Sequence, residues 1–145
     1  MNAPDLFTSY WSNPALRHTD AVKVSISRGQ PKWTVGFEYR RAMLLAPSRQ
    51  TFDLEDDADF EAAYLAELEE IGVQKITDLL KKISDEEGGR DLALLCYEAD
   101  PADCHRSMFA HWWFEQTGQV VEELQRCGSS QAKPRRAAQE RLFDL

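Results

Sequence analysis

The chain has 145 residues, of which 43% are hydrophobic and 29% are charged, and its formal net charge is −8. This length and composition predict one globular domain with its own core and exclude a disordered chain. No apolar run approaches the ~18 residues that a membrane-spanning helix needs, and the first residues lack the basic and apolar regions of a secretory signal. We therefore expect a cytoplasmic protein that does not bind a membrane.

The charge is distributed unevenly along the chain. From Arg126 onward there are five basic and two acidic residues, net +3, so the preceding part carries −11. Phosphate neutralisation needs clustered Lys and Arg, so the acidic part is not expected to bind DNA broadly. A nucleic acid would have to contact the basic end or a local positive pocket.

The first elements are predicted to be two strands. Residues 6–11 are rich in aromatic and β-branched side chains, and residues 21–27 alternate apolar and polar side chains before a loop with Gly29 and Pro31. The next part is harder to assign. We expect a short helix over residues 38–41 followed by a strand over residues 43–47.

Two amphipathic helices are predicted in the middle of the chain. Residues 57–71 and 73–87 each place apolar side chains on one stripe, and Gly72 separates them. Many carboxylates lie between Asp53 and Glu70. We interpret them as the solvated face and N-terminal charge of a helix rather than as a metal site.

The rest of the domain is predicted to be strand, helix and strand. Residues 91–97 form a nearly continuous apolar run, which is typical of a parallel strand buried on both faces. A helix follows from about Cys104 to Gly118, and residues 119–124 form a last strand. This alternation predicts an α/β fold over residues 1–126, a three-layer sandwich with a small, mainly parallel sheet.

Reactive residue types gather at the end of the apolar strand and at the start of the following helix. In open parallel sheets, ligands bind beyond the carboxyl ends of the strands. Cys96 and Glu98 stand at such an end, and Cys104, His105 and Arg106 begin the helix. A helix N-terminus favours anions and lowers the pKa of a cysteine. The spacing therefore indicates either an anion pocket or a thiolate nucleophile.

These residues also carry a resemblance to a known family. The segment from Leu94 to Glu98, with Asp100-Pro101 and Cys104-His105-Arg106, resembles the signature of the YeaO-like proteins, domain-of-unknown-function family 488. Upstream segments fit as well: Thr8-Ser9-Tyr10, Val24 to Gly29 with Pro31 and Trp33, and Leu45-Ala46-Pro47-Ser48. The resemblance covers roughly residues 5 to 125. It implies a small α/β fold in which Arg28 faces the cysteine and histidine group, and a role in nucleotide or DNA metabolism without an established reaction.

We predict an enzyme that acts on a phosphate-bearing or nucleotide substrate and needs no cofactor. The catalytic residues are predicted to be a nucleophile and its proton-transfer partners: Cys104, His105, Cys96 and Glu98. Arg106 and Arg28 are predicted to bind the anion.

Each of these residues has an alternative role. Either cysteine could be a packing residue, His105 could only orient the loop, and Arg106 could pair with Glu98 or Asp103. A metal site formed by both cysteines and His105, or a regulatory disulfide between the cysteines, also stays open. Three cysteines at irregular spacing do not otherwise form a disulfide framework or a paired zinc motif.

Residues 127–145 are predicted to form a flexible basic tail. Its end, Gln139-Glu140-Arg141-Leu142-Phe143, resembles the bacterial sliding-clamp-binding pentapeptide Gln-x-x-Leu-Phe. The resemblance implies that Leu142 and Phe143 enter an apolar pocket of the clamp while Gln139 bonds at its rim. Alternatively, Leu142 and Phe143 pack back on the domain. A non-catalytic nucleotide-binding, DNA-binding or adaptor module that the tail recruits to DNA repair or replication is therefore the second functional hypothesis.

Overall fold

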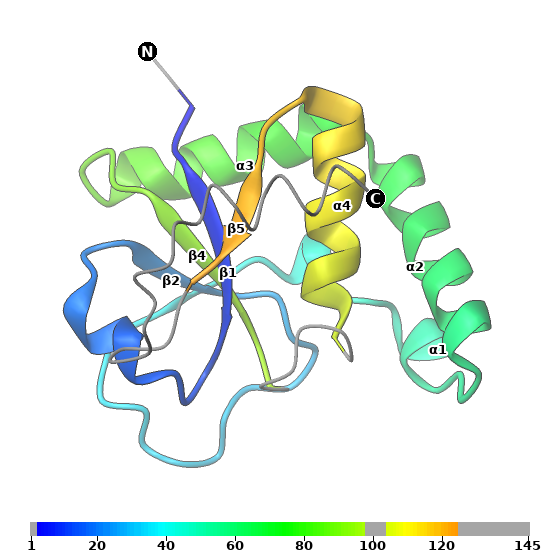
Figure 1. The fold of residues 1–145 in the computed structure, drawn as a ribbon, viewed down its shortest axis with the longest axis horizontal. Coiled ribbons are helices and arrows are strands. Elements are labelled where there is room, and N and C mark those ends of the chain that lie inside the picture. Colours follow the sequence, from blue (N-terminus) through cyan, green and yellow to red (C-terminus); the bar gives the residue numbers. More distant parts are fainter. Residues whose placement is uncertain (1–2, 98–103, 125–145) are drawn as a thin grey trace.

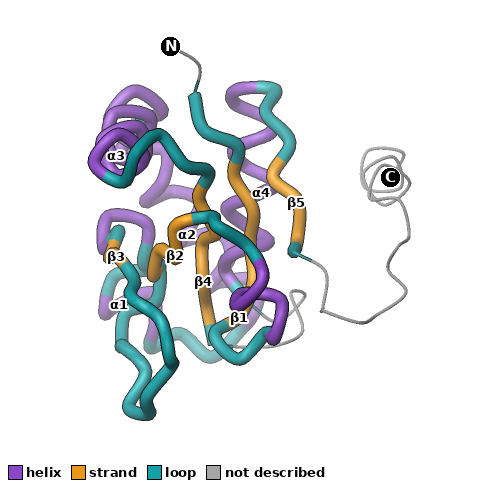
Figure 2. Tube along the Cα trace, turned by 90° about the vertical axis from the view of Figure 1, so that its left-hand side faces the viewer, coloured by secondary structure: helices purple, strands orange, loops and turns teal. Residues whose placement is uncertain are grey.

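Five parallel strands form the centre of the computed structural model, which describes residues 3–97 and 104–124 (Figure 1). The strands are β1 (Leu6–Tyr10), β2 (Val22–Ser25), β3 (Arg40–Arg41), β4 (Leu92–Cys96) and β5 (Val121–Glu123). Their order in the sheet is β3-β2-β4-β1-β5, and Figure 2 shows them side by side in this order. The predicted α/β class with a parallel sheet is confirmed.

The three long helices lie at the positions that the sequence predicts. The two long helices in the middle are α2 (Asp57–Ile71) and α3 (Val73–Glu86). Gly72, with φ of 90°, ends one and begins the other, a conformation that other residues rarely adopt. The helix after the buried strand is α4 (His105–Thr117), and a single turn, α1 (Arg49–Phe52), precedes α2.

Strand β4 is the middle strand, and its side chains divide the core into two clusters. All five of its residues are buried. Leu92, Leu94 and Cys96 pack under α2, α3 and α4, whereas Ala93 and Leu95 face the other side. The continuous apolar run is therefore explained by burial on both faces.

The two faces of the sheet are covered by different kinds of secondary structure. From β1 to β3 the chain crosses the sheet in one direction, and from β3 to β5 it returns. Because parallel crossovers keep one hand, the two sets of connections must lie on opposite faces. The return uses the α-helices, while the first crossings use the 3-10 helix η1 (Pro14–His18) and the half-buried residues Val35, Phe37 and Tyr39 (Figure 1). One outer layer is thus α-helical, and the other consists of a 3-10 helix and segments without regular secondary structure.

The expectation of a helix and then a strand between residues 38 and 47 is wrong. The order is reversed: β3 comes first and is followed by the 3-10 helix η2 (Met43–Leu45). Arg40 pairs with Val24 at the sheet edge, where a short polar strand is tolerated. The hydroxyl of the buried Tyr64 donates a 2.6 Å hydrogen bond to the Leu45 carbonyl oxygen, which holds this turn against α2.

Several predictions concern residues outside the described ranges. Glu98 lies in the segment 98–103, and the tail with Gln139, Leu142 and Phe143 lies in the segment 125–145. Within the described ranges, no helix is both long and apolar enough to cross a membrane.

Candidate functional site

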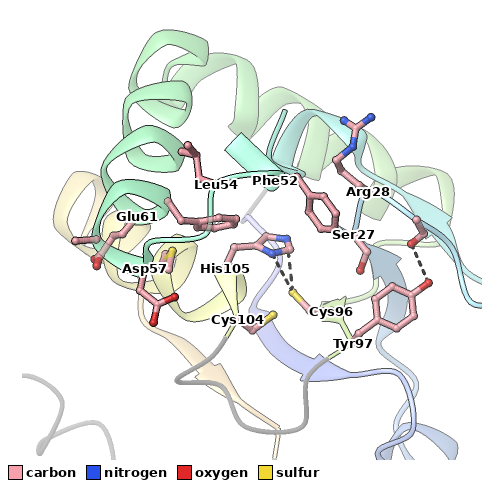
Figure 3. Close-up of a pocket in the computed structure, with 14 residues that line it drawn as sticks. Ser27, Arg28, Phe52, Leu54, Asp57, Glu61, Cys96, Tyr97, Cys104 and His105 are labelled. Atoms are coloured by element: carbon pink, nitrogen blue, oxygen red, sulfur yellow. Dashed lines mark hydrogen bonds between the residues drawn. The ribbon is translucent and has the colours of Figure 1, made fainter. Parts of the chain in front are cut away.

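A pocket of about 890 Å³ opens at the carboxyl ends of β2 and β4 (Figure 3). Ser27, Arg28 and Gly29 follow β2, whereas Cys96 and Tyr97 end and follow β4. The connections that leave these two neighbouring strands pass to opposite faces of the sheet. Such a switch point opens a crevice between adjacent strand ends, which is where ligands bind in open α/β sheets.

Two sulfur atoms and one imidazole meet inside this pocket. Cys96 is the last residue of β4, Cys104 directly precedes α4, and His105 is the first residue of α4. Both cysteines are buried, and their sulfur atoms and a ring nitrogen of His105 all lie within 4.8 Å of one another. The Cys96 Sγ atom lies 3.6 Å from Nε2 and 3.7 Å from Nδ1 of His105. The predicted group of Cys96, Cys104 and His105 is therefore brought together.

The His105 ring is held from two sides. Its Nε2 atom lies 2.6 Å from the carbonyl oxygen of Ile26, and its ring packs edge-on against Tyr64 with centroids 5.3 Å apart. A carbonyl oxygen only accepts hydrogen bonds, so Nε2 must carry a proton. In the neutral ring, Nδ1 is then the nitrogen that can accept a proton from a thiol.

The two thiols have opposite pKa shifts. A hydrogen bond from Cys96 lowers the pKa of Cys104 to about 4, with further lowering by His105 and by the backbone amide of Arg106, against the effect of burial. Burial, together with the hydrogen bond and charge of Cys104, raises the pKa of Cys96 well above its ordinary value. At neutral pH the pair therefore carries one negative charge, on Cys104, and one proton, on Cys96.

Arg106 does not line the pocket. Its side chain is fully buried, and its Nε and Nη2 atoms donate hydrogen bonds of 3.0 and 2.9 Å to the two carboxylate oxygens of Glu123 on β5. Thr8 on β1 donates a 2.7 Å hydrogen bond to the same carboxylate, and the Arg106 guanidinium lies 5.9 Å from the Tyr10 ring centroid. This placement makes Arg106 an anchor of the first turn of α4.

Arg28 lies at the rim of the pocket. Its side chain is exposed, and its Nη1 atom donates a 3.4 Å hydrogen bond to the carbonyl oxygen of Pro47. In Figure 3 its guanidinium group points away from the sulfur atoms. A ligand that contacts both the sulfur atoms and Arg28 must therefore extend from the bottom of the pocket to its rim.

The opposite wall of the pocket comes from α1, α2 and the chain between them. Phe52 and Leu54 are 57% and 41% exposed although they are apolar, and Asp57 and Glu61 stand one helical turn apart beside them. Sequence reasoning missed these residues, because we read the acidic segment only as a solvated helix face. The one available signal was two large apolar residues within a highly charged segment.

The three described residues Cys96, Cys104 and His105 could also hold a metal ion. Two thiolates and one imidazole with an open fourth position form a typical catalytic zinc site, and a histidine ligand usually donates its other N–H to a carbonyl. The separation of the Cys96 sulfur and the His105 nitrogens fits a hydrogen-bonded pair as well as a shared ion. A bound zinc ion would polarise a ligand atom or a water at that position.

The fold and the site define a small parallel α/β protein with a thiol-containing pocket at the carboxyl edge of its sheet. The chain belongs to the family described as Domain of unknown function DUF488, whose family model matches residues 17–113. This match includes β2, β4, both pocket cysteines and His105, and it confirms the resemblance seen in the sequence. Comparisons with curated proteins and with solved structures give no match.

Replacing Glu123 by Gln is expected to lower the free energy of unfolding by about 3 kcal/mol, because it leaves the buried Arg106 charge without its carboxylate. The matched control is Glu86→Gln, which removes a carboxylate from the exposed pair with Arg40, where water screens the interaction. Urea denaturation of both variants checks the difference. Equal losses of stability in the two variants would contradict the anchoring role.

The alkylation of Cys104 by iodoacetamide is expected to stay fast as the pH falls from about 8 to about 5 and to decline near the pKa of about 4, because only the thiolate reacts. Cys96→Ala removes the hydrogen bond that is the largest cause of the lowered pKa and should move this decline to higher pH. Mass spectrometry of the Cys104 peptide measures the rate, with Cys127 as internal reference. A decline centred near pH 8.5, the ordinary cysteine value, would show that Cys104 is not activated.

Proposed function

We propose that this protein is a cysteine-dependent enzyme that acts on a phosphate-bearing or nucleotide substrate at the pocket between β2 and β4. The observation that carries the proposal is the Cys104 thiol, which has a strongly lowered pKa and lies beside Cys96 and His105 in a pocket large enough for a small ligand. Perturbed thiols of this kind are typical of nucleophilic catalysis.

The chemistry would be a group transfer. The Cys104 sulfur would form a bond to the electrophilic atom of the substrate while the bond to the leaving group breaks. The leaving group would take the proton of Cys96, relayed by Nδ1 of His105, whose Nε2 contact with Ile26 orients the ring. Water would then release the transferred group, returning the thiolate to Cys104 and the proton to Cys96. Glu98, which follows Tyr97 in the chain, is the second candidate for moving protons.

The charges around the pocket suggest how a ligand lies in it. Arg28 stands on the β2 side, and the first turn of α4, which follows Cys104, adds the positive end of a helix dipole. Asp57 and Glu61 stand on the α2 side and would repel an anion. We therefore place the phosphate between Arg28 and the start of α4, and the apolar part of the ligand against Phe52.

A non-catalytic binding module is the second candidate. The same pocket would then hold a nucleotide without a reaction at the sulfur, and the exposed Phe52 and Tyr97 support ring contacts of this kind. The two candidates differ in whether the bound ligand is turned over at all.

In a panel of nucleoside monophosphates and triphosphates, the substrate is expected to bind about tenfold more weakly to Arg28→Ala, because one charge-assisted hydrogen bond is lost. Arg41→Ala, at an exposed position on β3, is the matched control and should bind normally. Cys104→Ser should keep binding and lose turnover, whereas Cys127→Ser should keep both. Calorimetry measures binding, and chromatography of the products measures turnover.

Turnover that survives Cys104→Ser would contradict the role of Cys104 as nucleophile. A nucleotide that binds to the unchanged protein without any turnover would favour the binding module. If the purified protein holds one zinc ion per chain, and Cys96→Ser loses both the zinc and the activity, the site is a metal centre and the nucleophile mechanism is rejected. Normal nucleotide affinity in Arg28→Ala would contradict the placement of the phosphate.

We also propose that the tail recruits the protein to the bacterial sliding clamp in DNA repair or replication. The support is the Gln139 to Phe143 motif, which stands after a segment rich in Gly, Ser, Lys and Arg. Replacing Leu142 and Phe143 together by Ala should weaken clamp binding at least tenfold, because both apolar anchors are removed. Asp144→Ala is the control next to the motif. Calorimetry with purified clamp measures the affinity, and unchanged affinity in the double variant would contradict the proposal that the tail binds the clamp.

A further inference from the structure

The two pocket cysteines stand close enough to react with each other. Their sulfur atoms lie within 4.8 Å, although Cys96 comes from the end of β4 and Cys104 from the residue before α4. Both line the pocket, so a small solute that enters it can reach them. We propose that Cys104 is a site of oxidation by hydrogen peroxide and that Cys96 closes a disulfide with it.

The two cysteines are suited to different steps. The first step needs a sulfur that faces the pocket and favours the thiolate form. Cys104 lines the pocket and directly precedes α4, whose positive N-terminal end favours a thiolate. The second step needs a thiol that can lose its proton on demand. The Cys96 sulfur lies 3.7 Å from Nδ1 of His105, which can accept its proton.

In the first step the Cys104 thiolate attacks one oxygen atom of the peroxide. An S–O bond forms and the O–O bond breaks, so the sulfur is oxidised to a sulfenic acid and the peroxide is reduced. The second oxygen leaves as hydroxide and takes up a proton from solvent to become the first water molecule.

In the second step the Cys96 sulfur gives its proton to His105 and attacks the Cys104 sulfur. The S–S bond forms and the S–O bond breaks. The hydroxide that leaves is protonated and becomes the second water molecule. In total, two thiols and one peroxide molecule give one disulfide and two water molecules.

The packing around the pair limits which sulfur can resolve the sulfenic acid. Cys96 is the only other cysteine within the described ranges, and it already contacts His105 from the end of the central strand. A disulfide requires an S–S distance of about 2 Å. The sulfur atoms must therefore approach each other, and they start from opposite ends of the short segment 97–103.

The disulfide would have a consequence for the pocket. It would remove the thiolate and so stop any reaction that uses Cys104 as nucleophile. This consequence rests on the proposed function, whereas the oxidation itself does not, because it needs no substrate. The pocket would then be active only when the cysteines are reduced.

The test uses the full chain with Cys127→Ser, reduced, freed of metal by a chelator and treated with hydrogen peroxide at about pH 6. At this pH an ordinary cysteine, with a pKa of about 8.5, is almost fully protonated, so unspecific oxidation is slow. Mass spectrometry should show the loss of two hydrogen atoms and a peptide that links Cys96 to Cys104.

Two further variants in the same background separate the steps. Cys96→Ser should stop at a Cys104 sulfenic acid that dimedone traps, and Cys104→Ser should react at least tenfold more slowly. Circular dichroism checks that each variant is folded, and Cys104→Ala replaces Cys104→Ser if it is not.

A protein that gains oxygen on Cys104 without forming the linked peptide would overturn the role of Cys96. Unchanged thiols under these conditions would overturn the whole inference. A disulfide that forms in a protein without nucleotide turnover would leave this inference intact while the proposed function fails. Turnover without a disulfide would give the reverse result.

Discussion

The ion pair between the buried Arg106 and the half-buried Glu123 fixes the part of the molecule on which the pocket depends. The Glu123 carboxylate accepts hydrogen bonds from Nε and Nη2 of Arg106 and from the Thr8 hydroxyl. This one carboxylate therefore links α4, β5 and β1. Cys104 and His105 are the two residues that precede Arg106. Their positions at the pocket therefore follow from an interaction on the far side of the same helical turn, which a solvent-exposed pair could not hold as firmly.

The position of this turn determines the chemistry of the sulfur atoms. It brings Cys104 to Cys96 at the end of a strand that is buried on both faces, where neither thiol is well solvated. Two buried thiols cannot both ionise at little cost, so the pair shares one negative charge. The hydrogen bond from Cys96, the imidazole of His105 and the amide of Arg106 assign that charge to Cys104. This division of roles within the pair supports both the proposed catalysis and the proposed oxidation.

Much of the fold could be predicted from the sequence, because its main elements have strong local signals. The apolar run before Cys96 and the stripes of the two long helices each indicate one structure. The segment between residues 38 and 47 has no such signal. Arg40 forms a strand because it can pair with Val24 at the edge of the sheet. Leu45 lies in a 3-10 helix whose position is held by the hydrogen bond from Tyr64 on a distant helix to the Leu45 carbonyl oxygen.

The site was predictable in part, for a related reason. The approach of Cys96 to Cys104 and His105 follows from the meeting of a strand end with the next helix start, which is local in sequence. The partner of Arg106 lies 17 residues further on, on a strand of only three residues, so the sequence did not show that Glu123 returns beside β1. The Phe52 and Asp57 wall depends on which side of α2 faces the strand ends, and charge alone does not reveal this.

A crystal structure of the reduced protein with a bound nucleoside monophosphate tests the central claim most directly. The account predicts the phosphate between Arg28 and the start of α4, the base against Phe52, and the Cys104 sulfur facing the ligand with no atom between it and Cys96. A metal ion held by Cys96, Cys104 and His105, or a nucleotide bound away from the ends of β2 and β4, would contradict it.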